Sequence, residues 1–239
     1  MNVLSPYLVE RPRPILGAQT VQLLLLRELL DYTVLRTEDS REINGVNTPL
    51  SIKDRKPVKR VAFLGSKQKA AESRELEALL RSACSTAKFE AKECWLKDNL
   101  CLECPRCALY GATALSDAPN IRHRIEYSTA FSLLTFDLLT EEITFNAVDE
   151  KSQMTGQALG TRHVVRPASI FPSIVALRSV TFHELILAVK TLLSSKSYGA
   201  ETRIGGDCRN TIIGIVAGWE EIITPLELTL ELYDKGLLE

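Results

Sequence analysis

The sequence predicts an α+β fold built on a largely antiparallel sheet, and three observations lead to this prediction. Strand patterns and helix patterns alternate irregularly along the chain, without a regular strand–helix–strand order. Several short segments alternate apolar and polar residues, as half-buried antiparallel strands do. Hydrophobic residues make up 45% of the 239 residues and charged residues 25%, a composition that is typical of an ordinary globular domain with a real core.

The first half of the chain holds one ambiguous segment and one clear helix. Residues 21–37 begin with leucines that suit a helix and end in a pattern that suits a strand, so periodicity leaves them open. Residues 66–84 form the clearer helix. Its apolar face carries Leu76, Leu79, Leu80 and Cys84. Residues 86–120 show no periodicity, and we interpret them as an insertion.

Three strands are predicted next. Residues 121–127 alternate strictly, with their two arginines on one side and their two isoleucines on the other. Residues 142–148 alternate in the same way. Residues 173–180 are short and mostly apolar, which favours a buried strand.

The strongest helix pattern lies in residues 181–195. Thr181 and Glu184 have the spacing of a capping box, and Gly199 lies just beyond the end of the pattern. The apolar positions repeat at the helical period and are Phe182, Leu185, Ile186, Val189, Leu192 and Leu193.

The last part of the chain is predicted to contain two more strands. Residues 211–218 are apolar and follow a glycine-rich turn. In residues 225–233, leucine recurs at every second position, which is the period of a strand. We see no internal repeat and no low-complexity tract.

The composition also limits the cellular context. No run approaches the roughly 20 apolar residues of a membrane span, and the first residues lack the basic and apolar regions of a signal peptide. We therefore expect a cytoplasmic protein without a membrane partner. Disulfides are unusual in that compartment, so clustered cysteines there are better explained as metal ligands.

Four of the six cysteines form one such cluster. Cys94, Cys101, Cys104 and Cys107 fall within fourteen residues, and the last three are separated by two residues each. Four thiolates complete a tetrahedral zinc site, which leaves no open position for water and is therefore structural. The sequence thus predicts a zinc ion that holds together an insertion without a core of its own.

Other interpretations of the cysteines remain open. Some of them are explained equally by burial as small hydrophobic side chains. An iron–sulfur cluster is the rival metal site, although the fourth cysteine and proline of the bacterial ferredoxin pattern are missing. His123 or Cys84 could replace one ligand, yet each also suits a packed position. Cys208 is too isolated to assign.

A basic stretch is the first candidate for binding nucleic acid. Between residues 51 and 69 a single acid, Asp54, accompanies seven cations: Lys53, Arg55, Lys56, Lys59, Arg60, Lys67 and Lys69. With Arg122 and Arg124 they could track phosphates, and the helix that begins near Gly65 favours anions at its N-terminus. The alternative is a solvated charged face. The net charge of −1 requires that any affinity come from such a local patch.

A glycine-rich segment is the second candidate. It places Gly199, Gly205 and Gly206 beside Arg203 and Arg209. Because it follows a helix and precedes a strand, it has the wrong order for a dinucleotide or P-loop motif. The two adjacent glycines are explained either by a tight turn or by close approach of the backbone to a phosphate chain.

Catalytic patterns are weak. The three histidines stand in unrelated contexts, and the sequence contains neither a nucleophile elbow nor the HExxH motif. Acidic pairs are most often surface turns. We therefore assign no catalytic residue.

Several segments taken together resemble one family. They are "CPRCALYGAT", "IRHRIEYSTAFSLL", "ITFNAVDEKSQMTGQAL", "FPSIVALRSVT" and "YGAETRIGGDCRNTIIGIVAGWEE". They resemble the Cas-seven (Csc-two) backbone subunit of type I-D CRISPR interference complexes, a branch of the repeat-associated (RAMP) superfamily. The resemblance runs from about residue 21 to the end and is most specific from residue 101 onward.

The resemblance implies an architecture. An RNA-recognition-motif-like (ferredoxin-like) antiparallel core would comprise residues 1–85 and 121–239, with residues 21–37 as a strand. Residues 86–120 would be the zinc-bearing insertion. A thumb hairpin would occupy residues 146–170 within the core.

The resemblance also implies a function. Members bind CRISPR RNA by its backbone, polymerise with further copies and other subunits, and support pairing of the guide with target nucleic acid. The loop around Gly205 and Gly206 would lie near the RNA. The alternative is a metal-dependent nuclease, because related subunits cut target through one loop aspartate. Only Asp39 and Asp149 are candidates for that role, and by position alone.

The thumb suggests one more contact. Its tip must part successive base pairs, which requires an apolar side chain without a fixed hydrogen-bond partner. Met154 in "SQMTGQALG" has these properties. The alternative is that Met154 packs on its own hairpin.

Overall fold

The computed structural model describes most of the 239 residues. The described parts are residues 3–13, 15–37, 42–87, 94–95, 99–113, 120–148, 151, 155–200 and 206–236. They form a mixed α+β structure with antiparallel sheets, which confirms the predicted class. Among the described residues, none of the helices combines the length and apolarity that crossing a bilayer needs.

The main sheet has four strands in the order β4-β8-β1-β9, and all neighbours are antiparallel. Its central strands are β1 (Thr20–Leu29) and β8 (Ile170–Arg178), and its edges are β4 (Ile125–Tyr127) and β9 (Cys208–Gly218). Two segments far apart in the sequence are thus brought side by side, because β1 and β9 pair along the whole length of β1 with one irregularity at Leu24/Leu25.

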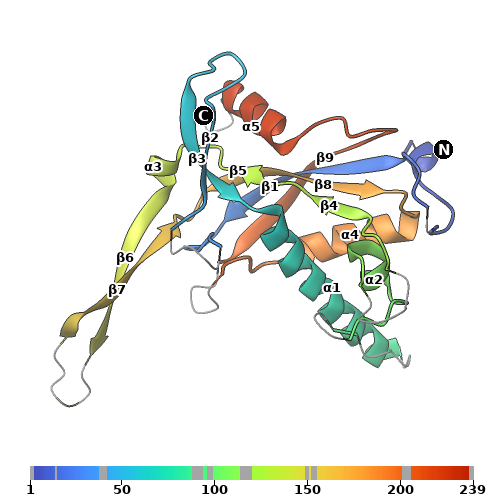
Figure 1. The fold of residues 1–239 in the computed structure, drawn as a ribbon, viewed down its shortest axis with the longest axis horizontal. Coiled ribbons are helices and arrows are strands. Elements are labelled where there is room, and N and C mark those ends of the chain that lie inside the picture. The colour runs from blue at the N-terminus through green and yellow to red at the C-terminus, as the bar shows by residue number, and fades with distance from the viewer. Residues whose placement is uncertain are drawn as a thin grey trace.

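Two smaller sheets complete the strands. The first has the order β2-β3-β5 and contains β2 (Gly45–Pro49), β3 (Pro57–Phe63) and β5 (Ala130–Phe131). The second is a hairpin of β6 (Thr140–Val148) and β7 (Thr155–Val165). The hairpin projects away from the body of the molecule (Figure 1).

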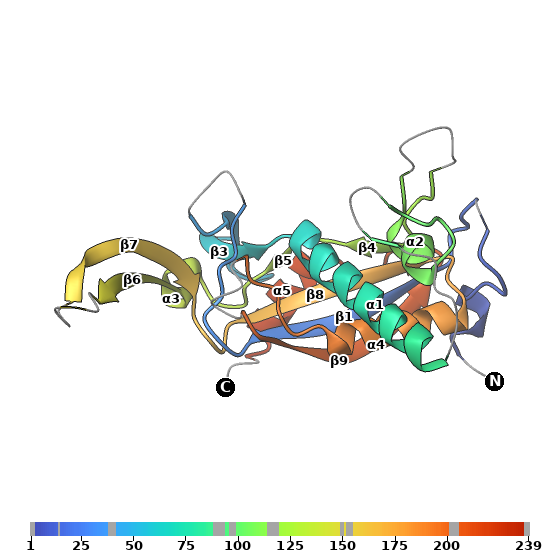
Figure 2. The ribbon, with the colours of Figure 1, turned by 90° about the horizontal axis from the view of Figure 1, so that it is seen from below.

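The helices lie on both sides of the main sheet. The long helix α1 (Gly65–Ala87) and α4 (Phe182–Ser194) cover one face, whereas α5 (Pro225–Asp234) lies on the other (Figures 1 and 2). Shorter helices are the 3-10 turn η1 (Ser5–Tyr7), α2 (Pro105–Tyr110) and α3 (Phe136–Leu139).

The largest core cluster lies between the main sheet and the two helices on its first face. Alternate residues of β1 supply Val21, Leu23 and Leu25, as the period of a strand requires. They pack with Leu76 of α1 and with the inner face of α4. A second cluster lies around Phe63 and includes Val61 of β3 and Phe171 of β8.

The two predicted helices are confirmed. In α4, Thr181 and Glu184 form the capping box, with Glu184 N–H donating to Thr181 Oγ1 at 3.2 Å. Only part of the predicted apolar face of α4 is buried, however. Leu185 and Leu192 are buried with Ala188. Phe182, Ile186 and Leu193 are exposed, because the sheet covers a narrower stripe than the pattern suggested.

The predicted strand over residues 225–233 is wrong, since this segment is the helix α5. Thr224 caps it with a second capping box, in which Glu227 N–H donates to Thr224 Oγ1 at 3.3 Å, and Pro225 occupies its first turn. A proline with preset φ and a capping residue start a helix even where leucines alternate. Leu228 and Leu230 are both buried against the body of the protein.

Two further strand predictions were too long. The strand that begins at Thr20 ends at Leu29, and of the later residues only Thr33 makes an isolated bridge. The strand predicted over residues 121–127 is confined to β4. Before β4 the strict alternation is broken, because Arg124 is buried while its neighbour His123 is exposed.

Candidate metal centre and nucleic-acid surface

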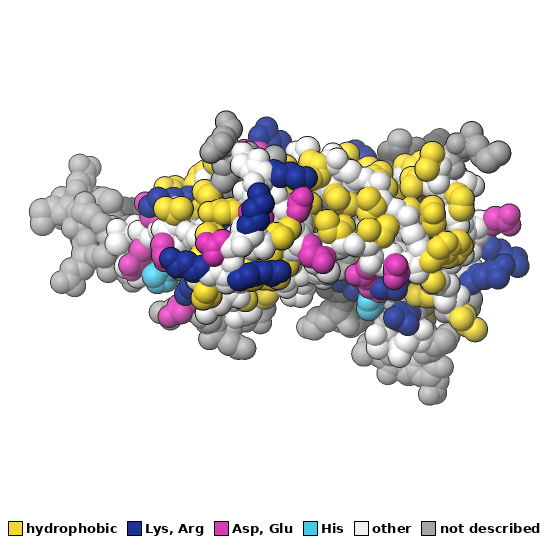
Figure 3. All heavy atoms as spheres, turned by 90° about the horizontal axis from the view of Figure 1, so that it is seen from above, with side chains coloured by type: hydrophobic (Ala, Val, Ile, Leu, Met, Phe, Trp, Pro, Cys, Tyr) yellow, Lys and Arg dark blue, Asp and Glu magenta, His cyan; other side chains and the backbone are white. Residues whose placement is uncertain are grey.

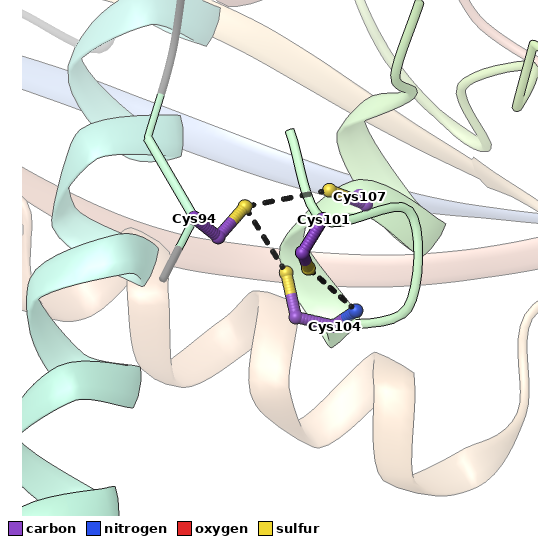
Figure 4. Close-up of side chains that lie close together, drawn as sticks. All are labelled: Cys94, Cys101, Cys104 and Cys107. Atoms are coloured by element: carbon purple, nitrogen blue, oxygen red, sulfur yellow. Dashed lines mark hydrogen bonds between the residues drawn. The ribbon is translucent and has the colours of Figure 1, made fainter. Parts of the chain in front are cut away.

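The four clustered cysteines meet at one point beside the end of α1 (Figure 4). All four sulfur atoms lie within 4.8 Å of one another. Cys94 Sγ is 3.6 Å from Cys107 Sγ and 3.7 Å from Cys104 Sγ. Cys104 occupies the N-cap position of α2 and Cys107 lies in its first turn, so the short helix brings these two thiols close together.

These separations match a tetrahedral ion better than a disulfide. Four thiolates at about 2.3 Å from one zinc ion leave about 3.8 Å between neighbouring sulfurs. A disulfide needs about 2.05 Å, and all four cysteines are free. The cluster is therefore compatible with a single metal ion held by four sulfurs.

The environment shifts the thiol pKa values of Cys94, Cys101 and Cys104 in different directions. Burial opposes the thiolate of Cys101, but the backbone N–H groups of Glu103 and Cys104 outweigh it and lower the pKa of Cys101 to about 7. Burial raises the pKa of Cys94 to about 11 and that of Cys104 further. A thiol with a lowered pKa supplies the thiolate that binds a cation first.

The segment that carries the four cysteines, residues 94–95 and 99–110, is called the cysteine module below, and two arginines bind it to α1. Arg81 on α1 donates from Nη2 to the carbonyl of Cys94 at 2.9 Å. The buried Arg106 on α2 donates to Ser73 Oγ at 3.1 Å, and its Nε lies 3.3 Å from the Glu77 carboxylate. The predicted insertion thus contacts the core directly, and Leu109 of α2 belongs to the largest core cluster.

The loop between β2 and β3 carries three exposed cations of the basic stretch. Lys53, Arg55 and Lys56 are all exposed there. The loop is held by Asp234 at the end of α5, whose carboxylate accepts hydrogen bonds from Ile52 N at 3.0 Å and from Lys53 N at 3.3 Å. The three cations are therefore presented on an anchored backbone.

The sequence placed Arg60 among the candidate RNA contacts, and the structure corrects that expectation. Its side chain is fully buried. Its guanidinium donates to Thr48 Oγ1 at 3.0 Å and to the carbonyls of Leu50 and Ser132 at 2.7 and 2.8 Å. Because Arg60 is fully buried and each of its three nitrogens donates to a protein oxygen, it offers nothing to a phosphate in this structure.

Arg124 is corrected in the same way. It is 3% exposed and forms a bidentate ion pair with Glu184, with Nη1 2.9 Å from Oε2. It also donates to the carbonyls of Ala108 at 3.1 Å and Ser179 at 3.1 Å. Its neighbour Arg122 is exposed and stays in the candidate set.

Three lysines of the stretch lie elsewhere on the surface. Lys59 is exposed on β3, with its ammonium 4.2 Å from the centre of the Phe136 ring. Lys69 lines a hollow of about 400 Å³ at the start of α1 together with His123, and burial lowers the pKa of Lys69. Lys67 is half-buried beside Phe63.

The glycine-rich segment is described at both ends. Gly206 has φ +67°, and a Cβ on it would lie 2.7 Å from the backbone nitrogen of Gly199. Glycine is therefore required by close backbone packing, which supports the tight-turn interpretation of that position. Arg209 is exposed on β9 and pairs with Glu28 on β1, with Nε 3.1 Å from Oε2. Arg203 and Gly205 lie outside the described residues.

The proposed thumb corresponds in part to the β6–β7 hairpin. Met154, Asp39 and Asp149 lie outside the described residues.

On the face of the molecule that carries α5, hydrophobic side chains gather in a broad area, and lysines and arginines lie toward both ends of it (Figure 3).

Sequence reasoning missed a buried polar network around Glu72. Glu72 is 1% exposed and Arg27 is fully buried, and their side chains pair at 2.8 Å. Both residues occupy positions that their periodic patterns assign to the inside, so a charged residue in register with apolar neighbours was the available signal.

Comparisons with known proteins agree with this fold. The family model of Csc2, described as "Csc2 Crispr", matches residues 7–237. The crystal structure of Csc2 from Thermofilum pendens is similar, with a TM-score of 0.73 and 21% identity, over 99% of this chain and 81% of that chain. Among curated proteins, none matches the sequence.

Chains from larger assemblies are similar as well. A chain of a type IV-B CRISPR complex has a TM-score of 0.54 and 12% identity, over 84% of this chain and 92% of that one. A chain of a CRISPR RNA-guided surveillance complex has a TM-score of 0.51 and 15% identity, over 80% and 66%. At these identities the likeness shows a shared fold.

Proposed function

This chain belongs to the Csc2 family of CRISPR proteins, and from that premise we propose that it is a guide-RNA-binding backbone subunit of a type I-D interference complex. Copies would assemble along the RNA with one another and with other subunits, and would support pairing of the guide with target nucleic acid. The family match over residues 7–237 is the observation that carries the proposal.

The exposed cations give the proposal a physical basis. Lys53, Arg55 and Lys56 are exposed on one anchored loop. Cations on such a loop recognise phosphates, which carry no base identity, so a subunit of this kind can bind any guide sequence. Arg122 and Arg209 are additional candidate contacts, as are Lys59 and the lysines of α1.

We assign the architecture accordingly. The main sheet with its helices would be the RNA-recognition-motif-like core of residues 1–85 and 121–239. The β6–β7 hairpin, which projects from the body, would be the base of a thumb over residues 146–170 (Figure 1). A projecting hairpin can reach the guide–target duplex, which a thumb hairpin interrupts in the family that the chain resembles.

The cysteine cluster would hold one structural zinc ion. Its four sulfurs lie around a single point, and an iron–sulfur cluster, which contains several metal atoms, would spread its ligands more widely. A four-thiolate site has no open position for water, so the ion would stabilise the module and would not catalyse a reaction. No catalytic residue is part of the proposal.

The test is the salt dependence of binding to single-stranded RNA. Each phosphate contact contributes a slope of about −0.7 in log affinity against log salt for single strands. Replacing Lys53, Arg55 and Lys56 with alanine should therefore flatten the slope by about 2.

The matched control removes three exposed cations from other places, by replacing Arg74, Lys190 and Lys235 with alanine. This variant has the same net charge and should keep the wild-type slope. Equal slopes for the two variants would mean that the loop is only a solvated face. No RNA binding by the wild type would overturn the proposed function itself.

A further inference from the structure

The strand β9 has an outer edge without the usual protection. In the described part of the chain it is the last strand of the main sheet, so a row of its backbone N–H and C=O groups faces away from β1. Proteins usually guard such an edge with charged residues or proline, because it can pair with another strand. Between Arg209 and Glu220 the sequence contains neither. Ile213 and Ile215, near the middle of β9, are 45% and 43% exposed.

A second apolar surface lies on α4. The exposed residues Phe182, Ile186 and Leu193 form a stripe with the half-buried Val189, repeating every three or four positions as one side of a helix does. The three exposed side chains are 47%, 51% and 44% accessible. Because Leu185 and its buried neighbours already provide the contact with the sheet, this stripe is a second apolar side of the same helix.

The stripe faces the same way as the open edge. Leu185 and Leu192 pack toward the sheet, and the helical period places the stripe about a quarter turn to one side of them. Glu184 lies on the opposite side, where it pairs with Arg124 next to β4, the far edge of the sheet. The stripe therefore turns toward β9, to which α4 is tied by a hydrogen bond from Asn210 Nδ2 to the Leu192 carbonyl at 2.8 Å (Figure 2).

The exposed isoleucines of β9 adjoin the stripe. Ile215 lies opposite Leu23, which belongs to the core between the sheet and α4. Opposite residues of paired strands share a face, so Ile215 lies on the α4 side. The register skips Ile213, which marks a bulge. We call the following residues the edge surface: Phe182, Ile186, Val189, Leu193, Ile213 and Ile215.

The size of the edge surface is that of an interaction site. Five of its side chains are close to half exposed and leave on the order of 400 Å² of apolar area, within the range of patches that mark such sites. A standard interface buries about 800 Å² on each partner. The apolar patch therefore supplies about half of that area, and the backbone edge of β9 with its polar surroundings can supply the rest.

The arrangement of the edge surface decides which partner fits it. The partner must bring a strand that pairs with β9 and, on the same face of the sheet, an apolar helix that meets the stripe. A second copy brings both. Rotation about a two-fold axis perpendicular to the sheet sets two β9 edges antiparallel and keeps both α4 helices on one face, so the surface is complementary to itself.

We propose that the edge surface binds a second copy of this chain, with the two β9 strands side by side and the two α4 stripes in contact across a two-fold axis. Such a contact closes on itself, so it differs from the repeating contacts by which copies would follow an RNA. The proposal goes beyond the proposed function and does not depend on it.

The test is sedimentation velocity of the full chain, freed of nucleic acid, over a range of concentrations. The wild type should form a dimer with a Kd on the order of 10 μM, as expected for an interface at the small end of the standard size. Ile186, near the middle of α4, lies close to the proposed axis. Ile186→Arg sets two like charges against each other and should weaken the dimer at least about 100-fold.

Leu138→Arg is the matched control, because Leu138 is a 59% exposed side chain on α3, outside the edge surface. It should leave the dimer unchanged. Both variants should keep the melting temperature of the wild type within about 2 °C, since the replaced side chains are exposed. Equal weakening by the two variants would mean that the edge surface is not the contact.

Mixing two variants tests the two-fold axis. Ile186→Asp should weaken the dimer as Ile186→Arg does, whereas an equimolar mixture of the two should restore it, because opposite charges then meet. Failure of the mixture to associate would contradict the two-fold arrangement.

Amide hydrogen exchange tests the pairing of the strands. The outer amides of β9 should exchange about tenfold more slowly in the dimer than in the monomer, since they gain hydrogen-bond partners. A dimer without this protection would refute strand pairing.

Two outcomes would overturn the proposal as a whole. The first is a wild type that stays monomeric at about 100 μM, ten times the expected Kd. The second is a monomer that associates with a different protein subunit and loses that association in Ile186→Arg, since the edge surface would then bind another chain.

Discussion

Replacing Arg124 with alanine should destabilise the protein without a specific effect on RNA. The substitution removes the bidentate pair with Glu184 and the hydrogen bonds to the Ala108 and Ser179 carbonyls. Glu184 is 8% exposed, so its carboxylate would stay buried without a cation. Breaking a buried pair from one side costs about 3–5 kcal/mol.

That cost converts into a large change in melting temperature. For a chain of this size, 1 kcal/mol shifts Tm by about 2–4 °C, so Arg124→Ala should lower Tm by about 6–20 °C. Arg122→Ala is the matched control, because the exposed neighbour loses the same side chain for about 0.5 kcal/mol or less. Differential scanning calorimetry of both variants measures the difference.

A second measurement separates stability from binding. RNA affinity measured well below the melting temperature should be no weaker for Arg124→Ala than for Arg122→Ala. If Arg124→Ala instead keeps Tm within about 2 °C of the wild type and loses RNA affinity, the guanidinium contacts RNA, and our reason for removing it from the contact set is wrong.

Three other predictions concern the metal, pH and the hairpin. Elemental analysis should find one zinc per chain, and Cys104→Ser should lose it and destabilise the module, since metal binding in small thiolate sites contributes on the order of 10 kcal/mol to folding; iron, or no metal, in fresh protein would contradict this. Burial raises the pKa of Glu184, but hydrogen bonds from Arg124 outweigh it and hold the folded-state pKa below the ordinary value of 4.5. The stabilisation is therefore complete above pH 4.5 and lost as pH falls through the lowered pKa; Glu184→Gln should flatten this acid limb of Tm against pH, and an unaltered limb would argue against the pair. Met154→Ala should leave Tm and guide-RNA affinity unchanged and reduce the chemical reactivity of flipped bases in the guide–target duplex; a fall in Tm of many degrees with the reactivity pattern intact would show that Met154 is packed.

Local patterns were reliable where one segment contains the whole cause. The capping box of α4 needs only Thr181 and Glu184, which are three positions apart and hydrogen-bond each other directly. The cysteine cluster was found for the same reason, because a short segment closes on itself at little entropic cost. The α5 segment shows the limit of a single period, since a cap and Pro225 outweighed the alternating leucines.

The buried cations could not be predicted from neighbouring residues. Arg60 belongs to a basic run and directly follows the exposed Lys59, yet its partner Ser132 lies 72 positions away. The anchor of Tyr198, Glu72, is 126 positions distant along the chain. For Arg60 and Arg124 we found no local signal that distinguishes an arginine exposed to water from one that donates to a carbonyl of a distant segment, whereas Arg27 stands in register with apolar residues of its strand.

The sequence by itself determined the fold class, the two strong helices, the cysteine cluster and the family. The first three followed because periodicity, capping and ligand spacing act between residues that are close along the chain, whereas the family followed from the resemblance of whole segments. Only the tertiary structure decided which cations remain exposed, how the cysteine module joins the core, and that Tyr127 and Tyr198 both donate to the buried Glu72. Those outcomes depend on burial, and whether a charged group is buried is decided by segments far away in sequence that fold over it and supply its partners.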